Sequence, residues 1–242
     1  MRNIKLVLEY DGTDFSGWQV QPRERTVQGV LEQSLEQVIQ ERVKTYAAGR
    51  TDSGVHALGQ VVNFHTRGRL DPASICRGLN ACLPRDVRVL QAEEVAESFH
   101  ARFDAVWRTY RYVISRRARA VGRQYAWFCK YPLDMERIRA ASAHLRGKHA
   151  FLSFSKVVEH EPHYMCNVKD IEWREEKEEL IFEITANRFL HHMVRLLVGT
   201  MVEVGRGKIP PERIRALLQS GERDVLGFTV PPHGLFLLEV TY

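Results

Sequence analysis

The sequence predicts an α+β protein made of two ferredoxin/RRM-like βαββαβ halves related by pseudo-twofold symmetry. Short stretches alternate between polar and apolar positions, which is typical of half-buried strands. Between them, apolar residues recur at helical spacing. The same order of elements occurs in residues 1–104 and 105–242, which are the two expected domains. We expect a mostly antiparallel sheet with helices on one face, and a cleft between the halves that binds a ligand.

Turn and capping residues mark the ends of the expected elements in residues 1–104. Asp11-Gly12 ends the first strand, and Thr26 can accept a hydrogen bond from the first turn of the helix that follows it. Asp71-Pro72 begins a second helix, because proline fits the first helical turn, and Pro84 ends it. The expected strands cover residues 5–10, 43–47, 59–65 and 86–93, and the expected helices cover residues 26–39 and 71–82.

Residues 105–242 show the same order. After a strand over 108–115, Asp134 begins a helix that we expect to end at Gly147. Strands over 168–174 and 180–186 form a predicted hairpin around the acidic turn 175–179. The half is completed by an apolar helix over 190–204, a short helix from Pro210-Pro211 to Gly221 and a final strand over 235–242.

Composition narrows the class of protein. Hydrophobic residues make up 44% and charged residues 27%, as in ordinary globular proteins. No apolar run approaches the ~18–20 residues of a membrane span, and residues 1–5 lead into the first expected strand without the apolar region typical of a signal peptide. The four cysteines lack zinc-type spacing, so we expect reduced thiols in a cytoplasmic protein. Proline interrupts the metal-like segment His160–His163, so we interpret this segment as a loop, and phosphate-loop and dinucleotide patterns are absent.

The charge distribution favours a polyanionic partner. The formal net charge is +5 and the pI is near 9.1. The densest basic stretch has one acid, Asp104, and contains Arg102, Arg108, Arg111, Arg116, Arg117, Arg119 and Arg123. Aromatic residues are interleaved, and Tyr110 and Tyr112 share one face of the expected strand. Arginines alternating with aromatic rings suit phosphate pairing and base stacking; a solvated strand with its rings in the core is the alternative.

Gly49 and Gly54 bracket the segment Arg50-Thr51-Asp52. Glycine tolerates positive φ and allows another molecule to approach the backbone closely. In an extended segment Arg50 and Asp52 point the same way, and a nearby arginine favours an ionised carboxylate. Asp52 is therefore a candidate nucleophile or base, whereas the alternative is a surface turn with two solvated charges.

The apolar helix expected over 190–204 carries an arginine, Arg195, that needs a partner if it is buried. One possibility is a contact with Glu203 or with the backbone at the helix edge. The other is a pair with Asp52 across the expected cleft. His191 and His192 lie four and three residues before Arg195, so we expect them to be its neighbours on the helix. One alternative is that they are metal ligands, but a histidine pair without further ligand spacing more often faces phosphate or the core.

Taken together, these segments resemble the TruA family of tRNA pseudouridine synthases over nearly the whole chain. The segment Gly49–His56, Gly-Arg-Thr-Asp-Ser-Gly-Val-His, is the most specific. The other matching segments are Leu8–Gly12, Phe15–Gln19, Asn80–Pro84, Phe99–Phe103, Arg108–Tyr112, Phe189–Arg195 and Gly234–Leu237. One departure is Cys166, where we would expect an arginine, and it weakens the transfer of an RNA contact at that position.

The resemblance implies an isomerase that converts uridine to pseudouridine at positions 38, 39 and 40 of the tRNA anticodon arm, after flipping the base. It implies that Asp52 is the essential aspartate, acting as the nucleophile at C1′ or C6 or removing the C2′ proton. It also implies that Arg50 helps to extrude the nucleotide or fills its place, and that Arg195 pairs with Asp52. Tyr110 would stack on the uracil. Further RNA contacts are expected from Arg108, Arg111, His191 and His192. The family's enzymes typically act as homodimers and need neither metal nor cofactor.

Two other functions are compatible with some of these features. A non-catalytic RNA-binding module would explain the basic aromatic strand and would leave its RNA unaltered. A nucleoside hydrolase using Asp52 would release free uracil, but no second carboxylate accompanies Asp52 at a recognisable spacing. Formation of pseudouridine therefore separates the isomerase from both alternatives.

Overall fold

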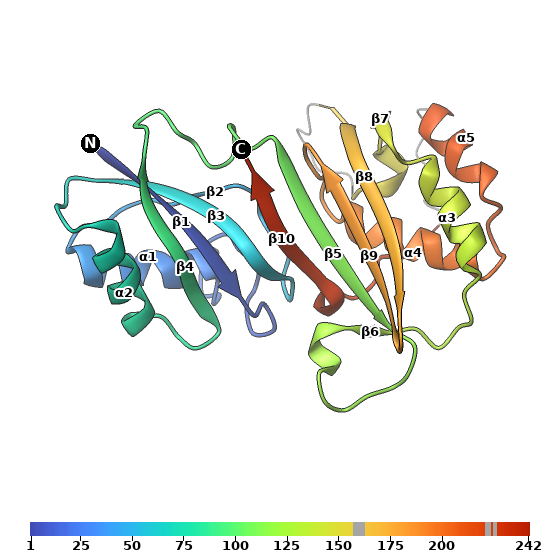
Figure 1. Ribbon diagram of the computed structural model, residues 1–242, viewed down its shortest axis with the longest axis horizontal. Helices are drawn as coiled ribbons and strands as arrows, with labels where there is room; N and C mark the ends of the chain where they lie inside the picture. The colour runs from blue at the N-terminus through green and yellow to red at the C-terminus, as the bar shows by residue number, and fades with distance from the viewer. Residues whose placement is uncertain (157–162, 221–223, 225–226) are drawn as a thin grey trace. The chain divides into compact units, whose positions relative to one another are not determined.

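The computed structural model describes residues 1–156, 163–220, 224 and 227–242, and it has the expected α+β class (Figure 1). The chain forms two compact units. The first contains residues 1–106 and 236–242, and the second contains residues 107–235. The halves expected from the sequence, 1–104 and 105–242, divide the chain at nearly the same place but leave residues 236–242 with the second half. No helix among the described residues is long and apolar enough to cross a membrane.

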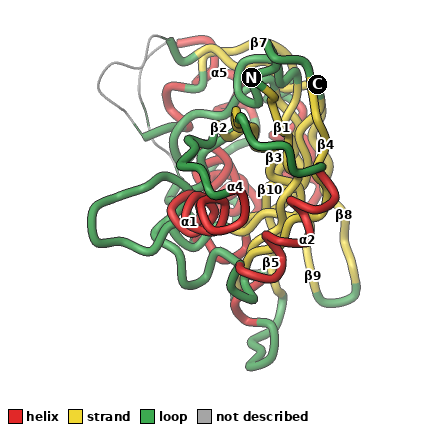
Figure 2. The backbone as a smooth tube through the Cα atoms, turned by 90° about the vertical axis from the view of Figure 1, so that its left-hand side faces the viewer, coloured by secondary structure: helices red, strands yellow, loops and turns green. Residues whose placement is uncertain are grey.

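The sheet of the first unit has the strand order β4-β1-β3-β10, with β2 paired on β3. The antiparallel strands are β1 (Arg2–Tyr10), β2 (Tyr46–Ala47), β3 (His56–Thr66) and β4 (Val87–Val95). The last strand, β10 (Leu235–Thr241), runs parallel to β3. The helices are α1 (Val27–Ile39) and α2 (Pro72–Cys82), and in Figure 2 α1 lies beside the layer of strands.

Capping residues begin both helices where the sequence predicts them. The Thr26 hydroxyl accepts a hydrogen bond from the Gly29 N–H, and the Asp71 carboxylate accepts one from the Ser74 N–H. Buried apolar residues then hold the helices, with Leu31 and Leu35 on α1 and Leu79 on α2. Apolar periodicity and capping residues were sufficient to predict both helices, because both signals arise from residues close together in the sequence.

The two faces of the first unit's sheet are covered differently. Ile4, Leu6 and Leu8 alternate along one face of β1 and are fully buried. On the other face, residues 96–104 cross the strands, and the Asn3 side-chain amide donates to the carbonyls of Ala96 and Phe99. A small core of Ala48, Val61 and Ala101, packed against Val7, Phe99 and Val240, lies on this second face. The crossing segment is therefore fixed by both polar and apolar contacts.

The sheet of the second unit has the strand order β5-β9-β8-β7, with β6 parallel to β5. Its strands are β5 (Trp107–Ser115), β6 (Trp127–Phe128), β7 (Gly147–Ala150), β8 (Met165–Glu176) and β9 (Glu179–Ala186). Its helices are α3 (Met135–Ala143), α4 (Met193–Gly205) and α5 (Glu212–Ser220). Almost every residue of α4 is buried, so this apolar helix is the core of the unit.

Several expected boundaries were wrong. The strand expected over 59–65 begins at His56, because His56 and Ala57 pair with Phe236 and Leu237 of β10, a partner distant in sequence. The strand expected over 43–47 is only Tyr46–Ala47. The helix expected to end at Gly147 ends at Ala143, since Gly147, with φ 96°, already begins β7 against Val168.

Pairing between strands distant in sequence decides where the expected elements agree with the structure and where they differ from it. The α+β class and the mostly antiparallel sheet are confirmed. The acidic turn expected over 175–179 is a tight hairpin in which Glu176 lies opposite Glu179, so the neighbouring glutamates lie in strands. Part of the segment His160–His163, residues 160–162, lies outside the described residues. The pseudo-twofold relation between the halves stays a prediction.

Candidate active site

The segment that carries Asp52 is clamped by the loop after β1. The Trp18 N–H donates to the Thr51 carbonyl at 3.1 Å, and the Gly54 N–H donates to the Phe15 carbonyl at 3.3 Å. Gly17 has φ 90°, and a Cβ there would lie 2.8 Å from the Thr51 carbonyl oxygen. Asp52 itself is half-buried and Arg50 is exposed. The backbone around the candidate nucleophile is therefore fixed on both sides.

A second close approach fixes the other end of this segment. A Cβ at Gly12 would lie 2.0 Å from the Val55 carbonyl oxygen, so only glycine fits there. The Gly12 N–H donates to Nδ1 of His56, a buried ring that stacks on Phe236 at 4.7 Å. Gly12 thus joins the end of β1 to the start of β3, directly after the Asp52 segment.

A buried polar network lies beneath the same segment. The Tyr10 and Thr51 hydroxyls share a hydrogen bond of 2.8 Å, and the Gln60 side-chain amide donates to the Gly49 carbonyl at 2.9 Å. Tyr10, Thr51 and Gln60 are all buried. The sequence did not predict this network. Tyr10 could have been found as the last inward-facing position of an alternating strand, but its partner at Thr51 is set only by the tertiary fold.

Because the hydroxyls of Tyr10 and Tyr112 are buried, we expect the protein to lose stability at alkaline pH. Burial raises the pKa of Tyr10 to about 12 and also raises the pKa of Tyr112. Because the unfolded chain releases these protons near pH 10, the contribution of the two tyrosines to the free energy of unfolding should be constant below that pH and fall as the pH rises from 10 toward 12.

Denaturant unfolding between pH 8 and pH 11 checks this expectation. The variant Tyr10→Phe should lose about 1 kcal/mol at pH 8, because the Thr51 hydroxyl loses its partner. Above pH 10 its decline should be shallower than that of the wild-type protein, with the remainder due to Tyr112. An identical decline in both proteins would contradict the assignment of the alkaline loss to Tyr10.

The second unit carries Tyr110 and Arg108 on β5, and both side chains are largely buried. The Tyr110 ring packs edge-on against Phe189, with the centroids 4.9 Å apart. Arg108 donates from Nη1 to the Asn187 carbonyl at 2.8 Å. Tyr112 is fully buried and donates from its hydroxyl to the Pro231 carbonyl. Of the two tyrosines, Tyr112 is a core residue.

Arg111 projects from β5 toward a glutamate on the neighbouring strand. Its Nε and Nη2 atoms lie 2.8 and 2.7 Å from Oε1 of Glu183, which also binds Arg174. Burial opposes ionisation of Glu183, but hydrogen bonds from Arg174 and Arg111 outweigh it and hold the pKa of this carboxyl below its usual value. A phosphate at Arg111 would have to compete with this pair.

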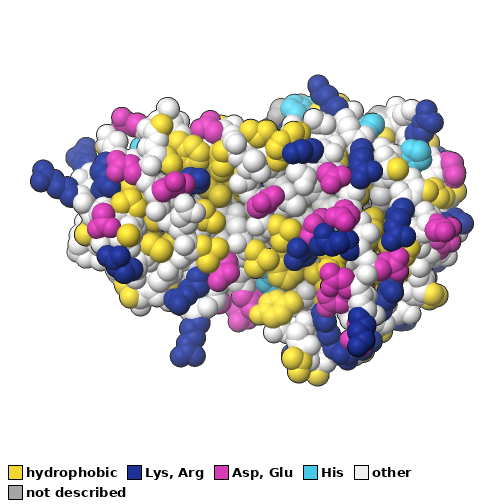
Figure 3. Space-filling view, viewed as in Figure 1, with side chains coloured by type: hydrophobic (Ala, Val, Ile, Leu, Met, Phe, Trp, Pro, Cys, Tyr) yellow, Lys and Arg dark blue, Asp and Glu magenta, His cyan; other side chains and the backbone are white. Residues whose placement is uncertain are grey.

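The arginines after β5 are neutralised by the β8–β9 hairpin. Arg116, Arg117 and Arg119 form ion pairs with Glu175, Glu178 and Glu179, respectively. Figure 3 shows basic and acidic side chains intermingled on this face of the second unit. The acids that balance these three arginines are some 60 residues away in sequence, so the single acid counted along the stretch does not describe the local charge. Tyr110 and the strand around it keep their candidate role.

The segment before α4 differs from the expected continuous helix. α4 begins at Met193, and His192 precedes it with φ 61°, so His191 and His192 are not helical neighbours of Arg195. Their rings instead lie 4.2 Å apart, with His191 exposed. Arg195 donates from Nε to the Val230 carbonyl at 2.8 Å, which is the backbone contact foreseen as one alternative. The pairing of Arg195 with Asp52 stays a prediction.

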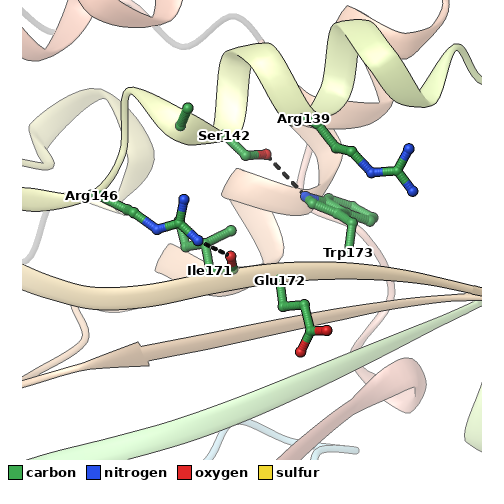
Figure 4. A pocket seen from close by; sticks show the side chains of 7 residues that line it. Arg139, Ser142, Arg146, Ile171, Glu172 and Trp173 are labelled. Carbon is green, nitrogen blue, oxygen red and sulfur yellow. Dashed lines mark hydrogen bonds between the residues drawn. The ribbon is translucent and has the colours of Figure 1, made fainter.

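A pocket of about 290 Å³ lies between α3 and β8 (Figure 4). Arg139 and Arg146 flank it, and Trp173 on its floor donates to the Ser142 hydroxyl. Both arginines are engaged with carboxylates, Arg139 with Glu175 and Arg146 with Asp170. The pocket therefore lacks the uncompensated positive charge of a phosphate site.

The first unit thus presents a half-buried carboxylate on a glycine-bounded segment that backbone hydrogen bonds hold on both sides. Fixed carboxylates of this kind serve as nucleophiles or general bases. The fold and the site define a candidate carboxylate-dependent enzyme of the α+β class, and comparison with known proteins identifies its family.

The model of the tRNA pseudouridine synthase family matches residues 6–104 and 141–242 of this chain. The tRNA pseudouridine synthase A of Exiguobacterium sibiricum is 43% identical over 242 residues, covering 100% of this chain and 97% of the relative. The enzyme of the same name from Thermoanaerobacter sp. strain X514 is 40% identical over 244 residues and covers 100% of both chains. This chain belongs to the tRNA pseudouridine synthase family, whose members are isomerases.

Among solved structures, the crystal structure of the archaeal box H/ACA sRNP Nop10–Cbf5 complex aligns with 97% of this chain and 45% of the solved chain. Its sequence identity is 13% and its TM-score is 0.35. The family model and the sequence relatives carry the family assignment.

Proposed function

We propose that this protein isomerises uridine to pseudouridine at positions 38, 39 and 40 of the tRNA anticodon arm, with Asp52 as the nucleophile. The observation that carries the proposal is the Asp52 segment: a half-buried carboxylate held by hydrogen bonds at Thr51 and Gly54, in a chain of this family. A nucleophile must be fixed within a fraction of an ångström to act efficiently, and this segment has few ways to move.

The reaction exchanges one bond for another within the same nucleotide. The N1–C1′ glycosidic bond breaks, the uracil turns, and a C5–C1′ bond forms; the proton leaves C5 and N1 gains one. No atoms enter or leave, so neither an oxidant nor a second substrate is needed. An ionised carboxylate beside the ribose can support the positive charge that develops at C1′ when the first bond breaks.

Supporting roles follow from the chemistry of the other residues. Arg50 is exposed beside Asp52 and is assigned to extruding the nucleotide, which costs a few kcal/mol. Tyr110 is assigned to stacking on the uracil, with Phe189 fixing the orientation of its ring. Arg195 is assigned to pairing with Asp52. Further RNA contacts are assigned to Arg108, Arg111, His191 and His192.

One assay tests activity, substrate and position together. Unmodified tRNA transcripts are incubated with the purified protein in buffer containing EDTA, and pseudouridine is mapped along each transcript. We expect pseudouridine at positions 38, 39 and 40 wherever the transcript has uridine there, without any added metal or cofactor. RNA that is bound but unaltered, or free uracil in the supernatant, would contradict the proposal. The proposal includes a cytoplasmic homodimer as the working form.

A further inference from the structure

We propose that three aromatic rings and two cations on the first unit form a second RNA-binding surface, on which unpaired bases of the tRNA substrate stack. The surface consists of Lys44, Tyr46, His100, Arg102 and Phe103, and is called the aromatic strip below. It rests on the proposed function, because the tRNA is the RNA that it would bind. It adds a contact outside the Asp52 segment.

The strip is a continuous row of rings with a cation at each end. The Tyr46 and His100 centroids are 5.1 Å apart, and those of His100 and Phe103 are 4.4 Å apart. Lys44 lies over the Tyr46 ring at 5.7 Å, and Arg102 lies over the Phe103 ring at 5.8 Å. Phe103 is 75% exposed, so most of its surface is available to a ligand.

The strip is held rigidly by the turn that carries two of its rings. The His100 N–H donates to the Asp104 carboxylate at 2.8 Å, and the Asp104 N–H donates back to the His100 carbonyl at 3.1 Å. Beneath the turn, the Ala101 N–H donates to the buried Asn63 side chain, and the Tyr242 hydroxyl donates to the Ala101 carbonyl. A large apolar ring is thereby kept in solvent by a well-bonded backbone, which lowers the entropy lost when a ligand binds.

The chemistry of the strip fits RNA better than a protein partner. Every base has a π face, so a row of exposed rings accepts unpaired bases of any sequence, while the flanking cations attract the phosphates. Protein–protein interfaces also use aromatic residues and arginine, but they are depleted in lysine, which stands at one end of this row. The carboxylate of Asp104, the acid of this turn, accepts a hydrogen bond from the His100 N–H. The strip therefore has the composition of a stacking platform.

The test compares tRNA binding by variants of Phe103, in the Asp52→Asn background so that the RNA stays unmodified. Phe103→Ala and Phe103→Leu should each raise the Kd by roughly five- to a hundredfold, because both remove a stacking ring. Phe103→Trp should bind as the parent does. The matched control is Leu90→Ala, since Leu90 is an exposed apolar residue of β4 in the same unit, and it should leave the Kd unchanged.

Two further measurements test where the tRNA lies and whether the aromatic strip binds RNA or another copy of the protein. Transcripts carrying 4-thiouridine should crosslink to the peptide that contains His100 and Phe103, and the crosslink should be lost in Phe103→Ala. Sedimentation of the same variants measures the oligomeric state, and we expect no change. An unchanged Kd in Phe103→Ala, a Phe103→Leu variant that binds like the parent, or a loss of oligomeric mass in Phe103→Ala would each overturn the proposal.

These outcomes separate the strip from the proposed catalysis. If the wild-type protein forms pseudouridine and Phe103→Ala binds tRNA normally, the RNA-binding role of the aromatic strip is refuted and the catalytic proposal stands. If the wild-type protein forms no pseudouridine and Phe103→Ala loses tRNA binding, the catalytic proposal is refuted and the strip remains an RNA-binding surface.

Discussion

The variant Asp52→Asn should lose pseudouridine formation by roughly 10³-fold or more while it still binds tRNA. Asparagine keeps the shape of the side chain but supplies no negative charge at the reacting ribose. Contacts with phosphates dominate RNA affinity, so the Kd for tRNA and its dependence on salt should stay close to those of the wild-type protein. Single-turnover rates with excess enzyme, and filter binding with the same transcript, measure the two quantities.

The control for Asp52→Asn is Asp14→Asn, which removes an exposed carboxylate from the loop that packs against the Asp52 segment. It should keep the wild-type rate, which shows that a change of net charge by one is not responsible. Thermal unfolding should be nearly unchanged in both variants, since neither carboxylate is deeply buried. Pseudouridine formed by Asp52→Asn at the wild-type rate would refute the catalytic role.

The variant Gly12→Ala should reduce kcat/KM by roughly 10²-fold although it touches no substrate. The added Cβ would lie 2.0 Å from the Val55 carbonyl oxygen and 2.5 Å from its carbon, whereas ordinary contacts are 3.4–4 Å. The backbone after Asp52 must therefore move by about 1 Å, a displacement that costs about a hundredfold in rate when it misplaces a catalytic group. Stability should also fall, by about 1–3 kcal/mol.

The matched control for Gly12→Ala is Gly68→Ala. The atom that a Cβ would meet at Gly68 is the Thr66 hydroxyl at 3.1 Å, a much longer approach than the 2.0 Å at Gly12, and Gly68 lies outside the Asp52 segment. Its kcat/KM should stay near the wild-type value, and its unfolding free energy should fall by less than that of Gly12→Ala. Rates are compared at a temperature where circular dichroism shows every variant folded. If Gly12→Ala kept the wild-type kcat/KM, the close approach at Val55 would not position Asp52.

The parts of the fold that were predicted correctly depend on neighbours in the chain. The caps at Thr26 and Asp71 and the alternation of β1 each arise within a few residues, so the sequence displays them directly. The errors occurred where a distant strand decides the boundary. The pairing of His56 with Phe236 extends β3, and the pairing of Gly147 with Val168 begins β7.

The candidate site shows the same division. Asp52 and its flanking glycines could be selected from the sequence, because residue type and spacing already carry the chemistry. The ion pairs of Arg116, Arg117 and Arg119 could not be predicted from the sequence, because their glutamates come from a hairpin that packs beside them only in the folded chain. Charge patterns read along a chain count neighbours in sequence, whereas the electrostatic field depends on neighbours in space.

The sequence by itself determined the α+β class, the identity of the candidate nucleophile and the resemblance to the family, because each depends on residue types at short spacing. Only the tertiary structure decided how the Asp52 segment is held, through Gly12, Thr51 and the buried Tyr10. It also decided which aromatic side chains are available to a ligand, with Tyr112 in the core and Phe103 in solvent. Burial is a property of the packed chain, and residue type alone does not fix it.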